Sequence, residues 1–203
     1  MAKRVIKVNL GSGPTGINGW SNYDWGVLPL LSKIYWIRDG LVKLGLLDKS
    51  YMAKWPEIEL VDIRKGIPQE DDSVNYIYCS HVLEHFEKSE TVTLLHECYR
   101  VMKKNGVMRI VLPDLLKLIS SYSNSDQFCR EFYGYNKDEK RWSNIFIRGH
   151  EWMYDKKTFR KILVEVGFKN IKLLSGGKGK VPDISKLDLK IHEKLSFYYE
   201  CEK

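Results

Sequence analysis

The sequence lacks long uncharged hydrophobic runs, paired cysteines and internal repeats, and these absences exclude several classes of protein. No apolar stretch reaches the roughly 18 residues that a membrane-spanning helix needs, and the chain does not open with an export signal. The four cysteines are scattered without C-x-x-C spacing, which disfavours a disulfide framework or a cysteine zinc site. We therefore expect reduced core thiols in a cytoplasmic protein, at Cys79, Cys98, Cys129 and Cys201.

The residues that are present are typical of one globular domain over 1–203. A chain of 203 residues with 43% hydrophobic and 29% charged residues can bury a core without disulfides or metals. The net charge of +7 comes mostly from 156–203, where lysine and arginine outnumber acidic residues two to one. Such a surface attracts nucleic acid, anionic lipid or a phosphorylated substrate, or is simply solvated. Without a nucleic-acid-binding motif, we expect no nucleic-acid partner.

A strand-like segment runs abruptly into glycines near the start of the chain. Apolar and β-branched residues over 5–10 are followed by Gly11, Gly13 and Gly16, as in a buried strand that ends in a tight loop. Because Gly11 and Gly13 have no Cβ, backbone N–H groups there can approach a nucleotide-like cofactor closely. The three glycines also match the dinucleotide fingerprint G-x-G-x-x-G, so two kinds of cofactor compete.

The residues after this loop favour one of the two cofactors. A dinucleotide fold requires a full crossover helix here, but 17–23 is short and turn-rich. A second strand is expected over 20–25, with Asp24 near its end. A carboxylate at that point can accept hydrogen bonds from both hydroxyls of a ribose. The sequence therefore offers a group that can bind a ribose, but not the helix that a dinucleotide needs at its pyrophosphate.

Strand-like and helix-like segments alternate along the rest of the chain. Strands are expected over 57–63, 76–79 and 107–112, one or two amphipathic helices over 27–47, and a helix from an N-cap at Ser89 to about residue 104, closed by 103–106. This alternation predicts a parallel, doubly wound α/β sheet, whose ligands bind beyond the carboxyl ends of the strands. The unusual residues fall at those ends, namely Gly11, Asp24, Asp62, Ser80, His81 and Asp114.

Several segments together resemble one family. They are NLGSGP at 9–14, WSNYD at 20–24, YIYCSHVLEHF at 76–86, ECYRVMKKNG at 97–106, VMRIVLPD at 107–114, HEWMYD at 150–155 and LVEVGF at 163–168. The sequence resembles the class I S-adenosylmethionine-dependent methyltransferases, specifically the small group associated with cell-surface glycan biosynthesis. The resemblance implies a Rossmann-like α/β fold: a seven-stranded, mostly parallel sheet with helices on both faces. It also implies a helix over 156–167, a strand over 168–174 and a final antiparallel strand over 195–200.

The resemblance further implies a set of cofactor-binding residues for S-adenosyl-L-methionine. The strand end and glycine loop would lie under the methionine part, Asp24 would bind the ribose, Asp62 and Ile63 would hold the adenine, and Ser80 with His81 would line the methyl group. The implied set is Leu10, Gly11, Ser12, Gly13, Asp24, Asp62, Ile63, Ser80 and His81. Two positions depart from the family pattern, because Asn9 replaces an acid and Thr15 replaces a glycine.

Three residues are candidates for catalysis of methyl transfer to a hydroxyl. A histidine has a pKa near neutral pH, so His81 or His150 could accept the proton of the acceptor, and Asp114 could bind the hydroxyl or assist a histidine. His85 is expected to make a structural hydrogen bond. The spacing of His81 and His85 matches half a metal site, but the sequence shows no third ligand, so we expect no metal.

Two insertions and one loop remain outside the motifs. Helical insertions at about 27–55 and 115–150 are expected to form a cap and an acceptor wall, the second being rich in aromatic residues. The first could also bind an apolar acceptor or make a weak contact with a membrane surface. The glycine-rich loop at 176–180 is either a phosphate cradle or a flexible connection, with the second favoured.

The resemblance and the site residues lead to a functional hypothesis. We expect a methyltransferase that uses S-adenosyl-L-methionine to methylate a hydroxyl of a small-molecule or glycan acceptor, such as a saccharide or glycan precursor. The alternative is a non-catalytic methyltransferase-like domain that binds or scaffolds, for which Asn9 and Thr15 would be signs of decay. An NAD-dependent oxidoreductase is disfavoured by the missing crossover helix, and no feature indicates an oligomeric state.

Overall fold

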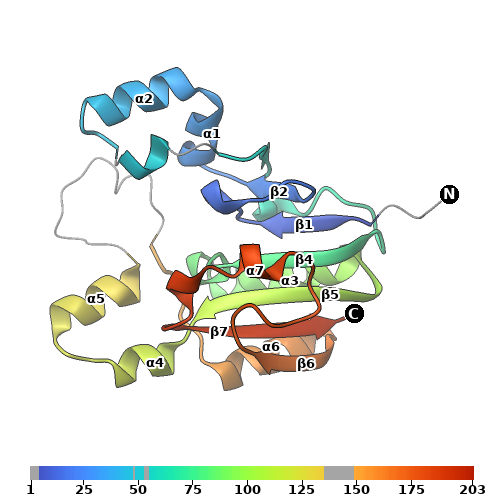
Figure 1. Cartoon of the computed structure of the whole chain (residues 1–203). Coiled ribbons are helices and arrows are strands. Elements are labelled where there is room, and N and C mark those ends of the chain that lie inside the picture. Colours follow the sequence, from blue (N-terminus) through green and yellow to red (C-terminus); the bar gives the residue numbers. More distant parts are fainter. Residues whose placement is uncertain (1–4, 48, 53–54, 135–148) are drawn as a thin grey trace.

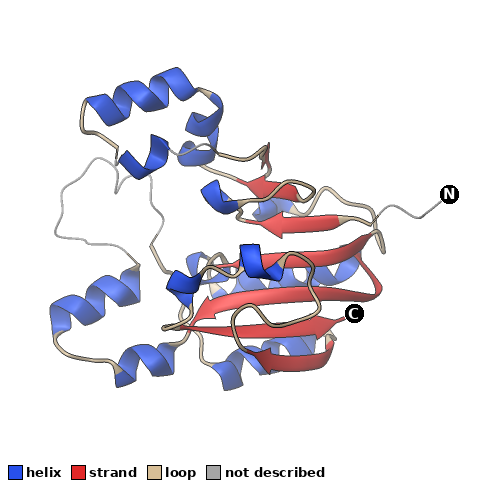
Figure 2. Cartoon of the chain, viewed as in Figure 1, coloured by secondary structure: helices blue, strands red, loops and turns tan. Residues whose placement is uncertain are grey.

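The computed structural model describes residues 5–47, 49–52, 55–134 and 149–203, which form one seven-stranded sheet with helices around it (Figures 1 and 2). The strands are β1 (Lys7–Leu10), β2 (Ser21–Asp24), β3 (Glu59–Leu60), β4 (Val74–Ser80), β5 (Met102–Pro113), β6 (Lys169–Leu174) and β7 (Ser196–Glu202). The helices are α1 (Val27–Lys33), α2 (Tyr35–Lys43), α3 (Lys88–Val101), α4 (Leu115–Ser120), α5 (Ser125–Tyr133), α6 (Lys156–Val166) and α7 (Ile184–Leu187). Short 3₁₀ turns include η1 (Gly13–Thr15), η3 (Ile63–Lys65) and η4 (Leu83–His85).

The strand order confirms the predicted α/β fold. The strands lie in the order β3-β2-β1-β4-β5-β7-β6, with the first five parallel and β7 antiparallel to both of its neighbours. Leu10 at the end of β1 pairs with Tyr23 of β2 and Cys79 of β4, so these strands end at the same level. The loops that follow them therefore meet at one edge of the sheet, where a ligand site is expected.

Each face of the sheet has its own hydrophobic cluster. The larger one joins β1, β4, β5 and β7 to α3 and α6, which lie behind the sheet in Figure 1. In α6, Phe159, Ile162, Leu163 and Val166 recur at helical spacing and are buried, because one stripe of the helix faces the sheet. On the other face a smaller cluster, including Tyr78 and Leu187, packs under the segment that carries α7.

The boundaries of α3 differ from the predicted ones. The helix begins at Lys88, and its N-cap is Glu87 rather than Ser89, because Glu87 and Glu90 form a reciprocal capping box. It ends at Val101, and the predicted closing residues 103–106 lie within β5. Asn105, with φ of 63°, adopts the left-handed conformation there. The predicted strand over 57–63 is also shorter, since β3 contains only Glu59–Leu60 before η3 begins.

A buried ion pair anchors the glycine-rich connection between β6 and α7. Arg109 of β5 is fully buried, pairs with Asp188 and donates hydrogen bonds to the carbonyl oxygens of Ser175 and Lys178. In return, the N–H of Gly177 donates to Asp188, and the N–H of Lys180 donates to Glu200. These N–H groups are bound to the carboxylates of the protein itself. The 176–180 loop is therefore a fixed connection and neither of the two alternatives considered from the sequence.

Three of the four cysteines are in the core. Cys79, Cys98 and Cys201 are buried free thiols, but Cys129 on α5 is exposed, so the expectation of a core thiol was wrong for that residue.

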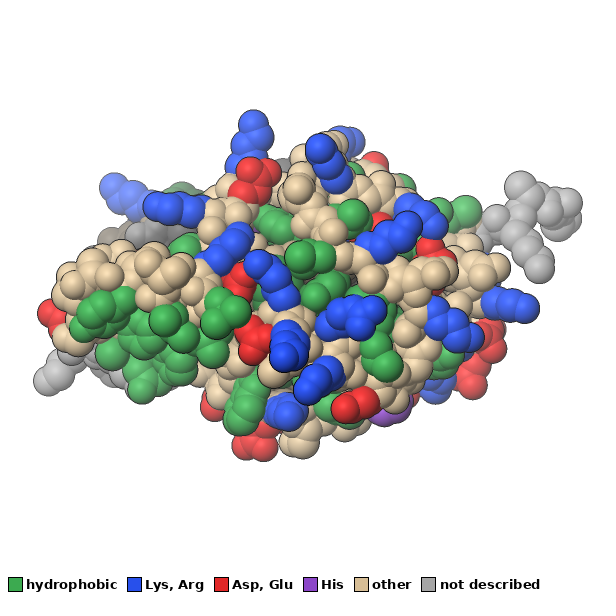
Figure 3. All heavy atoms as spheres, turned by 90° about the horizontal axis from the view of Figure 1, so that it is seen from below, with side chains coloured by type: hydrophobic (Ala, Val, Ile, Leu, Met, Phe, Trp, Pro, Cys, Tyr) green, Lys and Arg blue, Asp and Glu red, His purple; other side chains and the backbone are tan. Residues whose placement is uncertain are grey.

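Lysine and arginine side chains gather on the face seen in Figure 3, where α6 and β6 lie. The exposed basic residues of these elements are Lys157, Arg160, Lys161, Lys169 and Lys172. Within the described residues, no helix is long and apolar enough to cross a membrane.

Two pairs of helices lie beyond the carboxyl edge of the parallel strands (Figure 1). One is α1 with α2, which share a small apolar cluster of Leu31, Val42 and Leu47, and the other is α4 with α5. These are the described parts of the insertions predicted at 27–55 and 115–150. Their roles as cap and acceptor wall stay predictions, and three of the aromatic positions of the second, Tyr135, Trp142 and Phe146, lie outside the described residues.

Candidate active site

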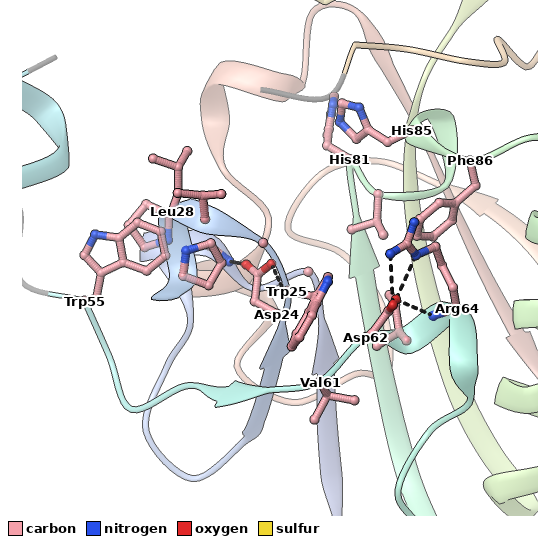
Figure 4. A pocket seen from close by; sticks show the side chains of 18 residues that line it. Asp24, Trp25, Leu28, Trp55, Val61, Asp62, Arg64, His81, His85 and Phe86 are labelled. Atoms are coloured by element: carbon pink, nitrogen blue, oxygen red, sulfur yellow. Dashed lines mark hydrogen bonds and ion pairs between the residues drawn. The ribbon is translucent and has the colours of Figure 1, made fainter. Parts of the chain in front are cut away.

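A cavity of about 530 Å³ opens at the carboxyl edge of the sheet (Figure 4). Its walls come from the loops after β1, β2, β3 and β4, together with α1. The lining residues are Gly11, Gly13, Pro14, Asp24, Trp25, Gly26, Val27, Leu28, Pro29, Trp55, Val61, Asp62, Ile63, Arg64, His81, Val82, His85 and Phe86. The sequence-predicted residues Gly11, Gly13, Asp24, Asp62, Ile63 and His81 thus lie around one space.

The glycine loop requires glycine at Gly11 and leaves space at Gly13. Gly11 has φ of +63°, and its N–H donates to the carbonyl of Tyr23 over 2.8 Å, which ties the loop to β2. A Cβ on Gly11 would lie 2.3 Å from Cγ2 of Val82, so a side chain would clash with the loop after β4. A Cβ on Gly13 would meet no atom within 4 Å, so the backbone there faces open space at the cavity.

Asp24 ends β2 with its carboxylate at the cavity. Its two oxygens accept hydrogen bonds from the N–H groups of Gly13 and Trp25, each with a donor–acceptor distance of 2.7 Å. Burial raises the pKa of Asp24 above its usual value, and the two backbone hydrogen bonds oppose that rise. Each oxygen keeps a further lone pair for a ligand. Between Gly16 and Asp24 there is no helix, as the sequence predicted.

Asp62 lies on the opposite side of the cavity and is held by Arg64. The guanidinium donates hydrogen bonds to both carboxylate oxygens, at distances of 2.8 and 2.9 Å (Figure 4). These hydrogen bonds and the charge of Arg64 lower the pKa of Asp62. Ile63, the next residue, is buried in the cavity wall. This arrangement gives the cavity a fixed ion pair beside an apolar surface.

His81 is held in an unusual conformation at the end of β4. Its φ is +54°, which is uncommon outside glycine and often marks a functional site. Nδ1 lies 3.1 Å from Oε1 of Glu84, Nε2 lies 3.0 Å from Oγ of Ser196, and the ring stacks on His192 with centroids 3.8 Å apart. Burial and the neighbouring His81 lower the pKa of His192 to about 4.

Glu84 is the residue on which the histidines converge, and sequence reasoning did not select it. Its side chain is completely buried. Burial by itself raises the pKa of Glu84, but the close contact with Nδ1 of His81 and the charges of His81 and His85 lower it overall. The sequence signal for this residue was its place in the HVLEH segment, between two histidines. His85, predicted to be structural, also lines the cavity.

Three other predicted residues are not part of the cavity lining. Leu10 is buried in the larger cluster, and Ser12 is buried in the loop. Ser80 has its side chain beside the hydroxyl of Tyr78, on the face of β4 that carries the smaller hydrophobic cluster. None of the three is among the lining residues, and their roles in cofactor binding stay predictions.

The remaining catalytic candidates also lie outside the lining. Asp114 is buried, accepts a hydrogen bond from the N–H of Leu116 and pairs with Lys156 over 3.0 Å, as in a helix cap. His150 packs against His85 with ring centroids 5.2 Å apart, and burial lowers its pKa. Asp114 thus has contacts that explain it structurally, whereas His150 belongs to the cluster around Glu84.

The two departures from the family pattern have structural roles. The amide of Asn9 donates to the side chain of Asn22 beneath the loop, over 3.3 Å. The hydroxyl of Thr15 donates to the carbonyl of Ser12 over 3.0 Å and closes η1. Both side chains stabilise the loop.

Comparison with known proteins places this site in a family. Residues 43–173, more than half of the chain, match the family described as a methyltransferase domain. The chain belongs to this methyltransferase family. It is a methyltransferase dependent on S-adenosyl-L-methionine, which is its cofactor. No curated protein matches the sequence significantly.

Solved structures share the fold of this methyltransferase. A methyltransferase from Archaeoglobus fulgidus that depends on S-adenosylmethionine is 18% identical, with a TM-score of 0.53, over 99% of this chain and 87% of that chain. A possible histamine N-methyltransferase from Thermotoga maritima is 12% identical, with a TM-score of 0.56, over 98% and 83% of the two chains. A mitomycin 7-O-methyltransferase is 13% identical, with a TM-score of 0.54, over 98% and 49%.

The cavity of this methyltransferase fits the cofactor chemically. The cofactor carries a ribose with two hydroxyl donors, and Asp24 offers acceptor oxygens at the cavity wall. A Cβ at Gly13 would extend into the open space beside that carboxylate. In the same loop, the buried Oγ of Ser12 has no hydrogen-bond partner among the described residues. These features are those of a loop built to be completed by a ligand.

Proposed function

We propose that this methyltransferase moves a methyl group from S-adenosyl-L-methionine to a hydroxyl of a saccharide or glycan precursor. The observation that carries the proposal is the buried Glu84 beside His81 at the wall of the cavity. A histidine supported by a carboxylate is suited to take a proton from a hydroxyl, and hydroxyls need such help more than amines do. The resemblance to glycan-associated methyltransferases supports the class of acceptor.

In the proposal, the two sides of the cavity divide the binding of the cofactor. Asp24 accepts hydrogen bonds from the ribose, and the open backbone at Gly13 leaves room for the methionine part. Asp62 and the wall at Ile63 hold the adenine. Trp25 and Trp55 add aromatic surface at the cavity, on which the C–H face of a sugar ring can stack.

His81 accepts the proton of the acceptor in this proposal. The cofactor supplies a methyl group that is already activated by its bond to a positively charged sulfur. With Nδ1–H directed to Glu84, the lone pair of His81 lies on Nε2, and a bound hydroxyl would replace Ser196 as its partner. The acceptor oxygen would form its bond to the methyl carbon as the carbon–sulfur bond breaks and the sulfur leaves as a neutral thioether. The proton of the acceptor moves to Nε2, and Glu84 stabilises the resulting imidazolium. The location in the cytoplasm and the single-domain arrangement remain part of the proposal.

A radiolabelled methyl-transfer assay tests this function. We expect turnover with free and nucleotide-linked saccharides, with the label bound to oxygen. His81→Gln should lower kcat by about 100-fold or more, the usual contribution of a general base, while the affinity for S-adenosylhomocysteine stays within about twofold. His96→Gln, at an exposed position of α3, is the matched control. Full turnover of the His81 variant, or label found only on nitrogen, would contradict the proposal.

A further inference from the structure

Four of the five histidines of the chain gather around one buried glutamate. His81 lies against Glu84, His192 stacks on His81, and His85 packs against His150. The fifth histidine is exposed on α3. Histidines from η4, from the segment after residue 148 and from the turn before β7 have therefore been brought together by the fold.

Glu84 is a buried carboxylate whose nearest charged partners are histidines. Its side chain is fully buried, and within the described residues neither carboxylate oxygen makes a well-formed hydrogen bond, although Oε1 is 3.1 Å from Nδ1 of His81. No lysine or arginine in the described part of the chain forms an ion pair with it. Buried carboxylates of this kind are normally paired with a cation or coordinate a metal.

The backbone of Glu84 fixes the segment that carries His150. The carbonyl oxygen of Glu84 accepts hydrogen bonds from the N–H groups of Glu151 and Trp152, over 2.7 and 3.1 Å. These bonds hold the segment from residue 149 onward against η4. His150 is thereby kept beside His85 although the two residues are far apart in the sequence.

Both of these histidines are oriented in the way typical of metal ligands. Nδ1 of His85 lies 3.1 Å from the carbonyl oxygen of Gly149, and Nδ1 of His150 lies 2.8 Å from that of Phe132. A carbonyl can only accept, so each Nδ1 carries the proton and each neutral ring keeps a lone pair on Nε2. A backbone carbonyl that holds the other ring nitrogen is a common outer partner of a metal-bound histidine.

We propose that Glu84, His85 and His150 bind a divalent first-row transition cation. One ligand atom from each residue lies within 4.8 Å of the other two. Two imidazoles and one carboxylate suit zinc, manganese, iron or cobalt better than magnesium or calcium, which favour oxygen ligands. This proposal departs from the expectation from sequence, which paired His81 with His85 and found no third ligand.

The site would act on the acceptor, a role that rests on the proposed function. Three protein ligands leave coordination positions free, and His85 is part of the cavity wall. A hydroxyl bound to the cation there would have a lower pKa and would lose its proton more easily to His81. The cation would also select acceptors with a second oxygen close by, such as the vicinal diols of sugars.

A cobalt titration tests the site without relying on activity. Protein treated with a chelator is titrated with Co²⁺, and the visible absorption of the bound ion is recorded. We expect saturable binding of one ion per chain. Loss of an outer partner alone weakens metal binding by about 10–100-fold, so Glu84→Gln and His150→Ala should each weaken it by at least about 100-fold. His96→Ala, at the exposed histidine, should leave the titration unchanged.

Two outcomes would overturn the site. One is the absence of a saturable cobalt spectrum from the wild-type protein, and the other is an unchanged titration of the His85→Ala/His150→Ala double variant. Circular dichroism of each variant checks the fold, and His150→Ala serves if Glu84→Gln does not fold. Affinity for S-adenosylhomocysteine is measured separately in chelator. Cofactor binding without cobalt binding would contradict only the metal site. Cobalt binding without cofactor binding would contradict the proposed function.

Discussion

Replacing Asp24 with alanine should weaken the binding of S-adenosylhomocysteine by at least about 1.5 kcal/mol, more than tenfold in dissociation constant. The carboxylate is the only acidic group beside the glycine loop among the cavity-lining residues, and hydrogen bonds to a charged acceptor are the strong ones. The same carboxylate also holds the N–H of Gly13, so its loss loosens the loop that shapes the cavity. Isothermal titration calorimetry measures the effect directly.

Two further variants separate the charge of Asp24 from its shape. Asp24→Asn keeps one oxygen and the size of the side chain, so we expect an intermediate loss of affinity. Asp126→Asn removes a similar charge from the exposed surface of α5 and should have no effect. If Asp24→Ala binds as tightly as the wild-type protein, the ribose is held elsewhere.

Replacing Asp188 with alanine should lower the free energy of unfolding by about 3–5 kcal/mol. Arg109 and Asp188 are both completely buried at their side chains, so the substitution removes the close counter-ion of a guanidinium in the core and leaves only Glu200, 3.9 Å away. It also removes the acceptor of the Gly177 N–H and loosens the segment that covers one face of the sheet. For a chain of this length, the melting temperature should fall by roughly 6–20 °C.

Surface and double variants show whether burial causes this loss. Asp71 pairs with Arg100 at the surface, where its side chain is 72% exposed, and Asp71→Asn should cost less than about 1 kcal/mol. The double variant Arg109→Met/Asp188→Leu removes both charges and should recover part of the stability, because the buried Glu200 that remains still accepts the N–H of Lys180. An Asp188→Ala protein that unfolds within about 1 kcal/mol of the wild type would refute the anchoring role.

Local chemistry made the central part of the fold predictable. In α6 the N-cap Asp155 and the left-handed Gly167 enclose a helical stripe of apolar residues, and all of these signals agree. At the start of α3 two capping signals compete. Ser89 is a good N-cap residue, but the reciprocal hydrogen bonds of Glu87 and Glu90 make Glu87 the N-cap. The strand pattern over 57–63 was cut short because Asp62 accepts the N–H of Arg64 and turns the chain.

The site was predictable where it depends on strand ends, and not where it depends on distant contacts. Gly11, Asp24 and His81 meet because parallel strands bring their carboxyl ends together. Ser80 falls on the face of Tyr78 because successive side chains of a strand alternate, which the sequence argument overlooked. The approach of His150 to Glu84 requires the backbone bonds that hold the segment after residue 148, and no local pattern reports those.

The most direct test of the account is calorimetric titration of the wild-type protein with S-adenosylhomocysteine and, separately, with NADH. The short connection between Gly16 and Asp24 leaves a cavity for an adenosyl amino acid and provides no helix for a pyrophosphate. The account predicts saturable binding of one S-adenosylhomocysteine per chain and no saturable binding of NADH. Absence of binding at millimolar S-adenosylhomocysteine, or saturable binding of NADH instead, would contradict it.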